Sequence, residues 1–198
     1  MRAKQILIPK RLLLVPAGLL FAQTLMGQAL FVFGGDSKAQ ACFDNAEYAA
    51  KNMPIVNKGM LEPCDYALDF GTLSLKDRAA TYCNRGIIHA ANENIESAMS
   101  DYSKALAISP NTPEIFVNRG NAHFMDRNFA MALENYDHSV VLGIDELHVV
   151  RYNMGMALEN IGNLEAAEEQ FLATLELQQG WELVENRLMR LQEKMLQY

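Results

Sequence analysis

The feature that most constrains this 198-residue chain is an internal repeat with a step of 34 residues. The stretch TYCNRG at 81–86 returns as IFVNRG at 115–120, and an aromatic residue stands two places before the asparagine in both. One further step, of 35 residues, reaches a third copy, so that three positions recur throughout: Gly86, Gly120 and Gly155; Ala98, Ala132 and Ala167; Tyr102, Tyr136 and Phe171. Repeats of about 20 to 50 residues are typical of solenoids, in which each unit buries its apolar face against its neighbours.

Each copy is predicted to form two helices. Apolar residues recur every three or four positions, as in AMSDYSKALAIS at 98–109, which is the spacing of one helical face. An asparagine stands where the second helix of each unit begins, and its side chain can accept hydrogen bonds from the first backbone amides: Asn94, Asn128 and Asn163. We therefore expect an all-α chain built from helical hairpins.

The repeated glycines fall in the middle of the first helix of each unit. A glycine there costs about 1 kcal/mol relative to alanine, so it needs a packing reason. We expect these glycines to face the repeated alanines of the second helix and to let the two helices approach closely.

The unit resembles the tetratricopeptide repeat in six positions, which the first unit, 79–112, matches in full: Tyr82, Gly86, Ala98, Tyr102, Ala105 and Pro110. The second unit, 113–147, and the third, 148–180, keep the glycine, the alanine and the second aromatic. They depart from the pattern at Ser139 and Ile144 in the second unit and at Arg151 in the third. The resemblance implies a right-handed solenoid of helical hairpins that binds other proteins.

Further helical segments are expected on both sides of these units. A step of 34 residues back from Ala98 reaches Cys64, so residues 42–78 are predicted to form a degenerate N-terminal hairpin. Residues 181–198 are predicted to form one capping helix with an apolar stripe: Trp181, Val184, Leu188, Leu191 and Met195. Such a helix would cover the last unit, as a solenoid requires.

Residues 1–41 have the layout of a secretory signal peptide. Four basic residues precede an uncharged run at 12–35, and Ala39-Gln40-Ala41 provides a small-x-small site before Cys42. This pattern predicts export, with the periplasm as the expected compartment. The alternatives are an uncleaved membrane anchor, because the run has about the length of a span, and a lipoprotein acylated at Cys42.

Charge and cysteines narrow the chemistry further. Outside 1–41 the chain has 12 basic and 23 acidic residues, a composition that repels nucleic acid, and it contains no basic stripe. An exported protein is expected to form a disulfide, and Cys42 with Cys64 is the preferred pair among three cysteines that also include Cys83.

The resemblance implies that the first helix of each unit lines an inner curved face. Nine residues are predicted to bind a partner peptide there: Asn84, Asn118, Asn153, Ile87, Val117, Asn121, Phe124, Tyr152 and Met156. The three aligned asparagines can each offer a donor and an acceptor to the main chain of an extended ligand, similar to the asparagine ladder of O-linked N-acetylglucosamine transferase. Two alternatives stay open. Each asparagine could bond a neighbouring helix, and Phe124 with Met125 could pack against an N-terminal segment of the same chain.

Other functions find little support in the sequence. The cations of the carboxylate clamp of tetratricopeptide co-chaperones are missing, since Ala80, Cys83, Glu114 and Val117 occupy their places. No zinc-type spacing, phosphate-binding loop or activated nucleophile occurs, so we expect neither a metal nor a cofactor, and no enzyme. The expected function is an adaptor or scaffold. The alternatives are a self-assembling structural protein and, less favoured, an accessory subunit of an envelope enzyme.

Overall fold

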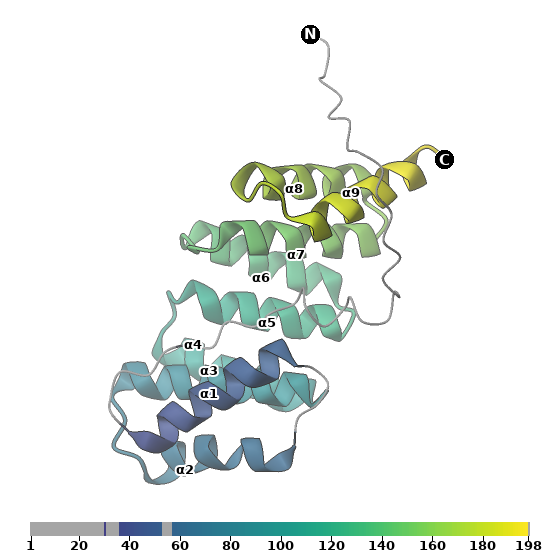
Figure 1. Cartoon of the computed structure of the whole chain (residues 1–198). Coiled ribbons are helices and arrows are strands. Elements are labelled where there is room, and N and C mark those ends of the chain that lie inside the picture. The colour runs from purple at the N-terminus through teal and green to yellow at the C-terminus, as the bar shows by residue number, and fades with distance from the viewer. Residues whose placement is uncertain (1–29, 31–35, 53–56, 198) are drawn as a thin grey trace.

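The computed structural model describes Leu30, residues 36–52 and residues 57–197, and every regular element in these ranges is helical (Figure 1). The elements are α1 (Ser37–Lys51), η1 (Lys58–Met60), α2 (Glu62–Phe70), α3 (Leu75–Ala91), α4 (Ile95–Ile108), α5 (Pro113–Met125), α6 (Phe129–Val141), α7 (Leu147–Asn160), α8 (Leu164–Leu177) and α9 (Glu182–Met195).

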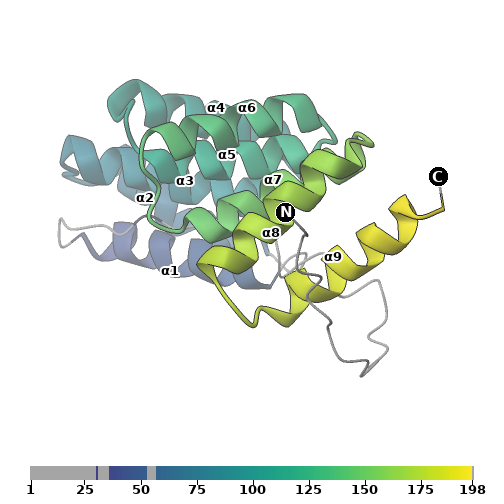
Figure 2. The same cartoon turned by 90° about the horizontal axis from the view of Figure 1, so that it is seen from above.

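Three helical hairpins, α3 with α4, α5 with α6 and α7 with α8, are stacked in chain order (Figure 1). The helices α1 and α2 lie at one end of the stack, and α9 lies against α8 at the other. Seen from above, α4 lies on one side of α3 and α1 on the other (Figure 2). The predicted all-α array of helical hairpins is confirmed. None of the helices in the described ranges is both long and apolar enough to cross a membrane.

The second helix of each hairpin begins as the sequence predicts. The side chains of Asn94, Asn128 and Asn163 accept hydrogen bonds from the backbone amides three residues later, at 3.2, 3.3 and 3.4 Å. The residue before each asparagine has a positive φ, between 59° and 83°, which makes the tight turn between the two helices. That residue is Glu93, Arg127 or Gly162, so only the third unit uses the amino acid that this conformation favours.

The repeated glycines make room for rings and not chiefly for alanines, which corrects the sequence-based prediction. A Cβ atom built on Gly86 would lie 2.6 Å from the ring of Tyr102, and the nearest atoms at the two other glycines likewise belong to Tyr136 and Phe171. Only at Gly120 does an alanine appear among the nearest neighbours, through the carbonyl oxygen of Ala132 at 3.2 Å. The large ring lies one turn beyond the alanine on the second helix, and its atoms are the nearest to the glycine.

The fold begins earlier than residue 42, the boundary expected from the sequence. The carboxylate of Asp36 accepts hydrogen bonds from the backbone amides of Lys38 and Ala39, at 2.8 and 3.1 Å, and so caps α1. Ala39 is fully buried, in a cluster with Ala67 and Ala80. Ala39, the first small residue of the stretch that resembles a cleavage site, therefore lies on the contact surface of α1.

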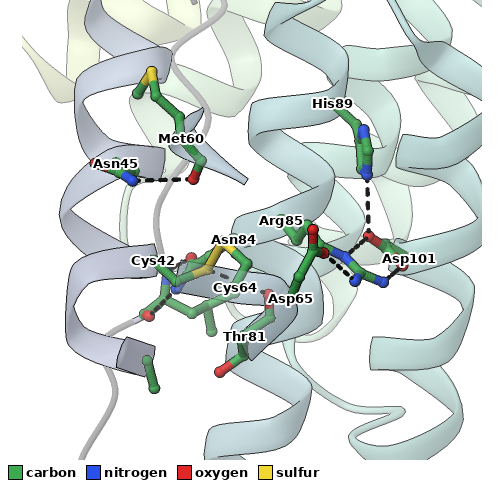
Figure 3. Close-up of a disulfide and its surroundings, with 12 residues drawn as sticks. Cys42, Asn45, Met60, Cys64, Asp65, Thr81, Asn84, Arg85, His89 and Asp101 are labelled. Atoms are coloured by element: carbon green, nitrogen blue, oxygen red, sulfur yellow. Dashed lines mark hydrogen bonds and ion pairs between the residues drawn. A yellow bond between two sulfur atoms is a disulfide. The ribbon is translucent and has the colours of Figure 1, made fainter. Parts of the chain in front are cut away.

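A disulfide between Cys42 and Cys64 joins α1 to α2, and this is the pair preferred from the sequence (Figure 3). Cys83 is a free, buried thiol in the same apolar cluster. Burial raises the pKa of this thiol to about 12. It is therefore protonated at neutral pH and is a packing residue.

Candidate protein-interaction site

The three aligned asparagines lie in the middle of the first helix of each hairpin. Asn84 is on α3, Asn118 on α5 and Asn153 on α7, and all three are buried, with at most 1% of their surface exposed. A buried amide must find partners, because a donor or acceptor left unpaired costs about 1–3 kcal/mol. The partners of each asparagine are therefore informative.

Asn84 binds the main chain of a residue that is 54 positions away. Its Oδ1 atom accepts a hydrogen bond from the backbone N–H of Leu30 at 2.8 Å, and its Nδ2 atom donates to the carbonyl oxygen of Leu30 at 2.9 Å. One side-chain amide thus pairs with both polar groups of one residue. This is the main-chain contact predicted for the asparagines, made here with a segment of the same chain.

Asn118 and Asn153 also contact adjacent helices. The Nδ2 atom of Asn118 donates to the sulfur of Cys83 on α3 at 3.3 Å, and that of Asn153 donates to Oδ1 of Asn121 on α5 at 3.1 Å. Asn121 accepts a second hydrogen bond from the hydroxyl of Tyr136 at 2.8 Å. Two buried atoms, Asn121 Nδ2 and Asn153 Oδ1, have no hydrogen-bond partner within the part of the chain that the structure describes. These contacts match the alternative in which each asparagine bonds a neighbouring helix.

The apolar residues predicted to form the floor of the groove are not open to solvent. Ile87 belongs to a buried cluster that includes Cys42 and Ala46 of α1. The others belong to a second cluster that includes residues of α9: Val117, Phe124, Tyr152 and Met156. These five residues, predicted to contact a partner peptide, are at most 7% exposed. They are therefore core residues in this structure, in clusters that also contain residues of α1 and α9.

The side of α3 that faces α4 carries a charge cluster (Figure 3). Arg85 donates to the buried carboxylate of Asp101 through Nε at 2.7 Å and Nη2 at 2.9 Å, and to Asp65 through Nη1 at 2.7 Å. The hydrogen bonds that Arg85 donates to Asp101 raise the pKa of Arg85 above its usual value. His89 Nε2 lies 3.9 Å from Asp101, but burial lowers the pKa of its ring, so it is neutral at pH 7.

This charge cluster is a structural feature of the hairpins. Arg119 occupies the place of Arg85 in the next unit and donates from Nε to Oδ1 of Asn135 at 2.6 Å. Both contacts join the first helix of a hairpin to the second. In the described ranges no three histidine, cysteine or acidic side chains gather in an arrangement suited to a metal ion.

Reasoning from sequence missed the contribution of Leu30. The residue lies inside the uncharged run at 12–35, where nothing in the spacing of residues distinguishes it from its neighbours. Asp101 was also missed, although it follows Arg85 by 16 residues just as Asn135 follows Arg119. That second relationship could have been found by comparing the repeats.

Comparison with known proteins supports the assignment of the repeats. Residues 86–126 match a family model described as TPR repeat, and residues 149–180 match one described as tetratricopeptide repeat. A curated relative, the Protein SGT1 homolog of Bos taurus, is 32% identical over 60 residues, or 30% of this chain. The chain spans only 18% of the length of that relative.

Two solved structures have a similar fold. The NMR structure of the first TPR domain of the human RPAP3 protein covers 62% of this chain and 95% of its own, with a TM-score of 0.58 and 21% identity. The first TPR of Spaghetti (RPAP3), bound to the HSP90 peptide SRMEEVD, covers 61% of this chain and 95% of its own, with a TM-score of 0.57 and 21% identity. The chain thus contains tetratricopeptide repeats, and its helical hairpins have the fold of a tetratricopeptide-repeat domain.

Proposed function

We propose that this protein is a non-enzymatic interaction module that binds an extended segment of another protein along the inner face of α3, α5 and α7. The observation that carries the proposal is the pairing of Asn84 with both main-chain groups of Leu30. A side chain that binds main-chain groups recognises the backbone of a segment whatever its side chains are. The bound HSP90 peptide of a structural neighbour supports a protein partner of this general kind.

The partner proposed here is not an acidic chain terminus. Ala80, Cys83 and Val117 occupy places where a carboxylate clamp needs cations, and the whole chain has a formal charge of −7. An acidic peptide such as SRMEEVD would therefore meet repulsion without a compensating ion pair. The amide of Asn84 and the apolar cluster against which Leu30 packs suit an uncharged segment instead.

The test compares partner capture by the wild-type chain with capture by Asn84→Ala and Asn118→Ala variants. Binding proteins are first identified by crosslinking in the cells that make the protein, and the affinity of each purified candidate is then measured. We expect Asn84→Ala to lose at least about tenfold in affinity, the effect of one or two hydrogen bonds. Asn118→Ala should lose less, because the Asn118 amide donates to Cys83. The matched control is Asn186→Ala, which removes an exposed amide on α9. Unchanged affinity in folded Asn84→Ala and Asn118→Ala proteins would exclude the inner face as the binding site.

We also propose that the protein is exported to an oxidising compartment. The basic start, the uncharged run and the Cys42–Cys64 disulfide support this. Cleavage after Ala41 would remove Leu30, the capping residue Asp36 and the buried Ala39, so we expect the mature chain to retain all three. N-terminal sequencing of protein recovered from the envelope fraction tests this. Recovery from the cytosol with three free thiols would contradict export.

A further inference from the structure

We infer that Leu30 competes with the partner segment for Asn84. A partner must therefore displace Leu30 and place an uncharged residue other than proline, with an apolar side chain, in its position. This inference rests on the proposed function and specifies both the kind of partner and how access to the site is regulated.

Leu30 is held as a bound peptide would be held. Its N–H and carbonyl groups both pair with Asn84, at 2.8 and 2.9 Å. Its side chain packs against an apolar cluster to which three helices contribute: Ala39 on α1, Ala67 on α2 and Ala80 on α3. Polar recognition of the main chain and apolar burial of the side chain thus coincide at a single residue.

The same surroundings define the guest residue. A charged side chain would be transferred into an alanine-lined site without a counter-ion, which is costly. A proline has no N–H and would leave Oδ1 of Asn84 without its donor. An apolar residue other than proline satisfies both requirements, as Leu30 does.

The connection to the rest of the chain makes Leu30 an effective competitor. Residues 31–35 link it directly to Asp36, the cap of α1. A short tether gives Leu30 an effective concentration in the millimolar range at its site. A separate partner segment can therefore compete only at a higher concentration or through additional contacts. The apparent affinity for a guest is therefore reduced by the fraction of molecules in which Leu30 occupies the site.

The experiment uses the full chain, with intact mass confirmed by mass spectrometry, and a probe peptide taken from its own sequence. The probe is a fluorescein-labelled peptide of residues 24–36, TLMGQALFVFGGD, with two lysines added at its labelled end for solubility. A second probe is identical except for N-methylation at the residue that corresponds to Leu30. Fluorescence anisotropy gives the affinity of each probe for wild-type, Leu30→Pro, Leu30→Met and Asn84→Ala chains.

We expect the Leu30→Pro chain to bind the first probe about tenfold more tightly than wild type, because its own segment has lost one of two hydrogen bonds. Leu30→Met retains both main-chain groups and should bind as wild type does. The N-methylated probe should bind about tenfold more weakly than the first. Asn84→Ala should bind the two probes with equal affinity, because it lacks the acceptor for the N–H group.

The outcomes separate this inference from the proposed function. Equal affinity of Leu30→Pro and wild type, together with loss of the difference between the two probes in Asn84→Ala, would overturn the competition and leave the binding site in place. A folded Asn84→Ala chain that still binds the two probes with different affinities would overturn both. If Asn84→Ala fails to fold, as circular dichroism would reveal, the two probes decide, since equal affinities would exclude recognition of the N–H group.

Discussion

Arg85 on α3 holds the buried carboxylate of Asp101 on α4 through two hydrogen bonds, of 2.7 and 2.9 Å. Arg119 on α5 repeats this contact with Asn135 on α6, at 2.6 Å, so a polar pair joins the two helices in each of these hairpins. The first pair is ionic and the second is not, although the two stand in the same register of the repeat.

The ionic pair should be a strong contributor to the stability of the first hairpin. Asp101→Ala would leave Arg85 with only Asp65, which is half exposed, and removal of one partner from a buried pair is strongly destabilising. We expect the free energy of unfolding to fall by about 3 kcal/mol in urea denaturation, the lower end of the range for such a loss, because Arg85 keeps Asp65. Asp65→Asn is the control and should cost less than about 1 kcal/mol, because exposed pairs contribute little. Equal effects of the two substitutions would refute this ranking.

Stability should decrease in mild acid because of His89 and His123. Burial lowers the pKa of both rings below the usual value of 6.5, so the unfolded chain binds more protons than the folded one as the pH falls through that value. Stability contributed by the neutral rings is present above about pH 6.5 and is lost progressively below it. Replacing both residues by glutamine should flatten the pH dependence of the unfolding free energy between pH 7 and 5. An unchanged slope would argue against the two histidines as its source.

Gly86→Ala should destabilise the chain in spite of the helix propensity of alanine. The added Cβ atom would lie 2.6 Å from the ring of Tyr102, which is fully buried and cannot move without disturbing the core. Overpacking of this kind costs about 1–3 kcal/mol, more than the gain of about 1 kcal/mol from replacing a glycine in a helix. In a Tyr102→Leu background the same substitution should cost less, and a double-mutant cycle measures the coupling. Additive effects would show that the ring is not the obstacle.

Glu93→Gly should stabilise the turn before α4. Glu93 has a φ of 61°, a conformation that costs a residue with a Cβ atom about 1–2 kcal/mol. The entropy that glycine loses on folding offsets part of this, so we expect a gain of about 0.5 kcal/mol. The converse substitution, Gly162→Ala, meets no atom within 4 Å of the new Cβ and should therefore destabilise through the backbone alone. Thermal melting of both variants checks the opposite signs.

Loss of the disulfide should weaken the N-terminal end of the stack. The bond closes a loop with a sequence separation of 22 residues, for which the chain-entropy model gives about 3 kcal/mol. The Cys42→Ala, Cys64→Ala double variant should be less stable by roughly this amount in denaturant titrations. A reducing agent should destabilise the wild type alone. If it destabilised the double variant equally, the effect would not come from this bond.

Much of the hairpin array could be predicted because its determinants are local and repeated. The 34-residue step, the helical spacing of apolar residues and the asparagine caps each depend on residues within one unit. They placed α3 to α8 correctly and identified the glycines as close-contact positions. The residue that packs against Gly86 could not be predicted from the repeat, because both Ala98 and Tyr102 lie on the same face of α4. Only the packed helices show that Tyr102 is the nearest residue.

The candidate site shows the limit of the same reasoning. Sequence alone determined that Asn84, Asn118 and Asn153 share one register on the first helices, since a fixed step through equal helices brings equal positions to one face. Only the tertiary structure decided what covers that face: Leu30 pairs with Asn84 across 54 residues, and the asparagines of the later units bond to neighbouring helices. A periodic pattern reports which side of a helix is buried, whereas the identity of the covering group depends on contacts between segments that share no period.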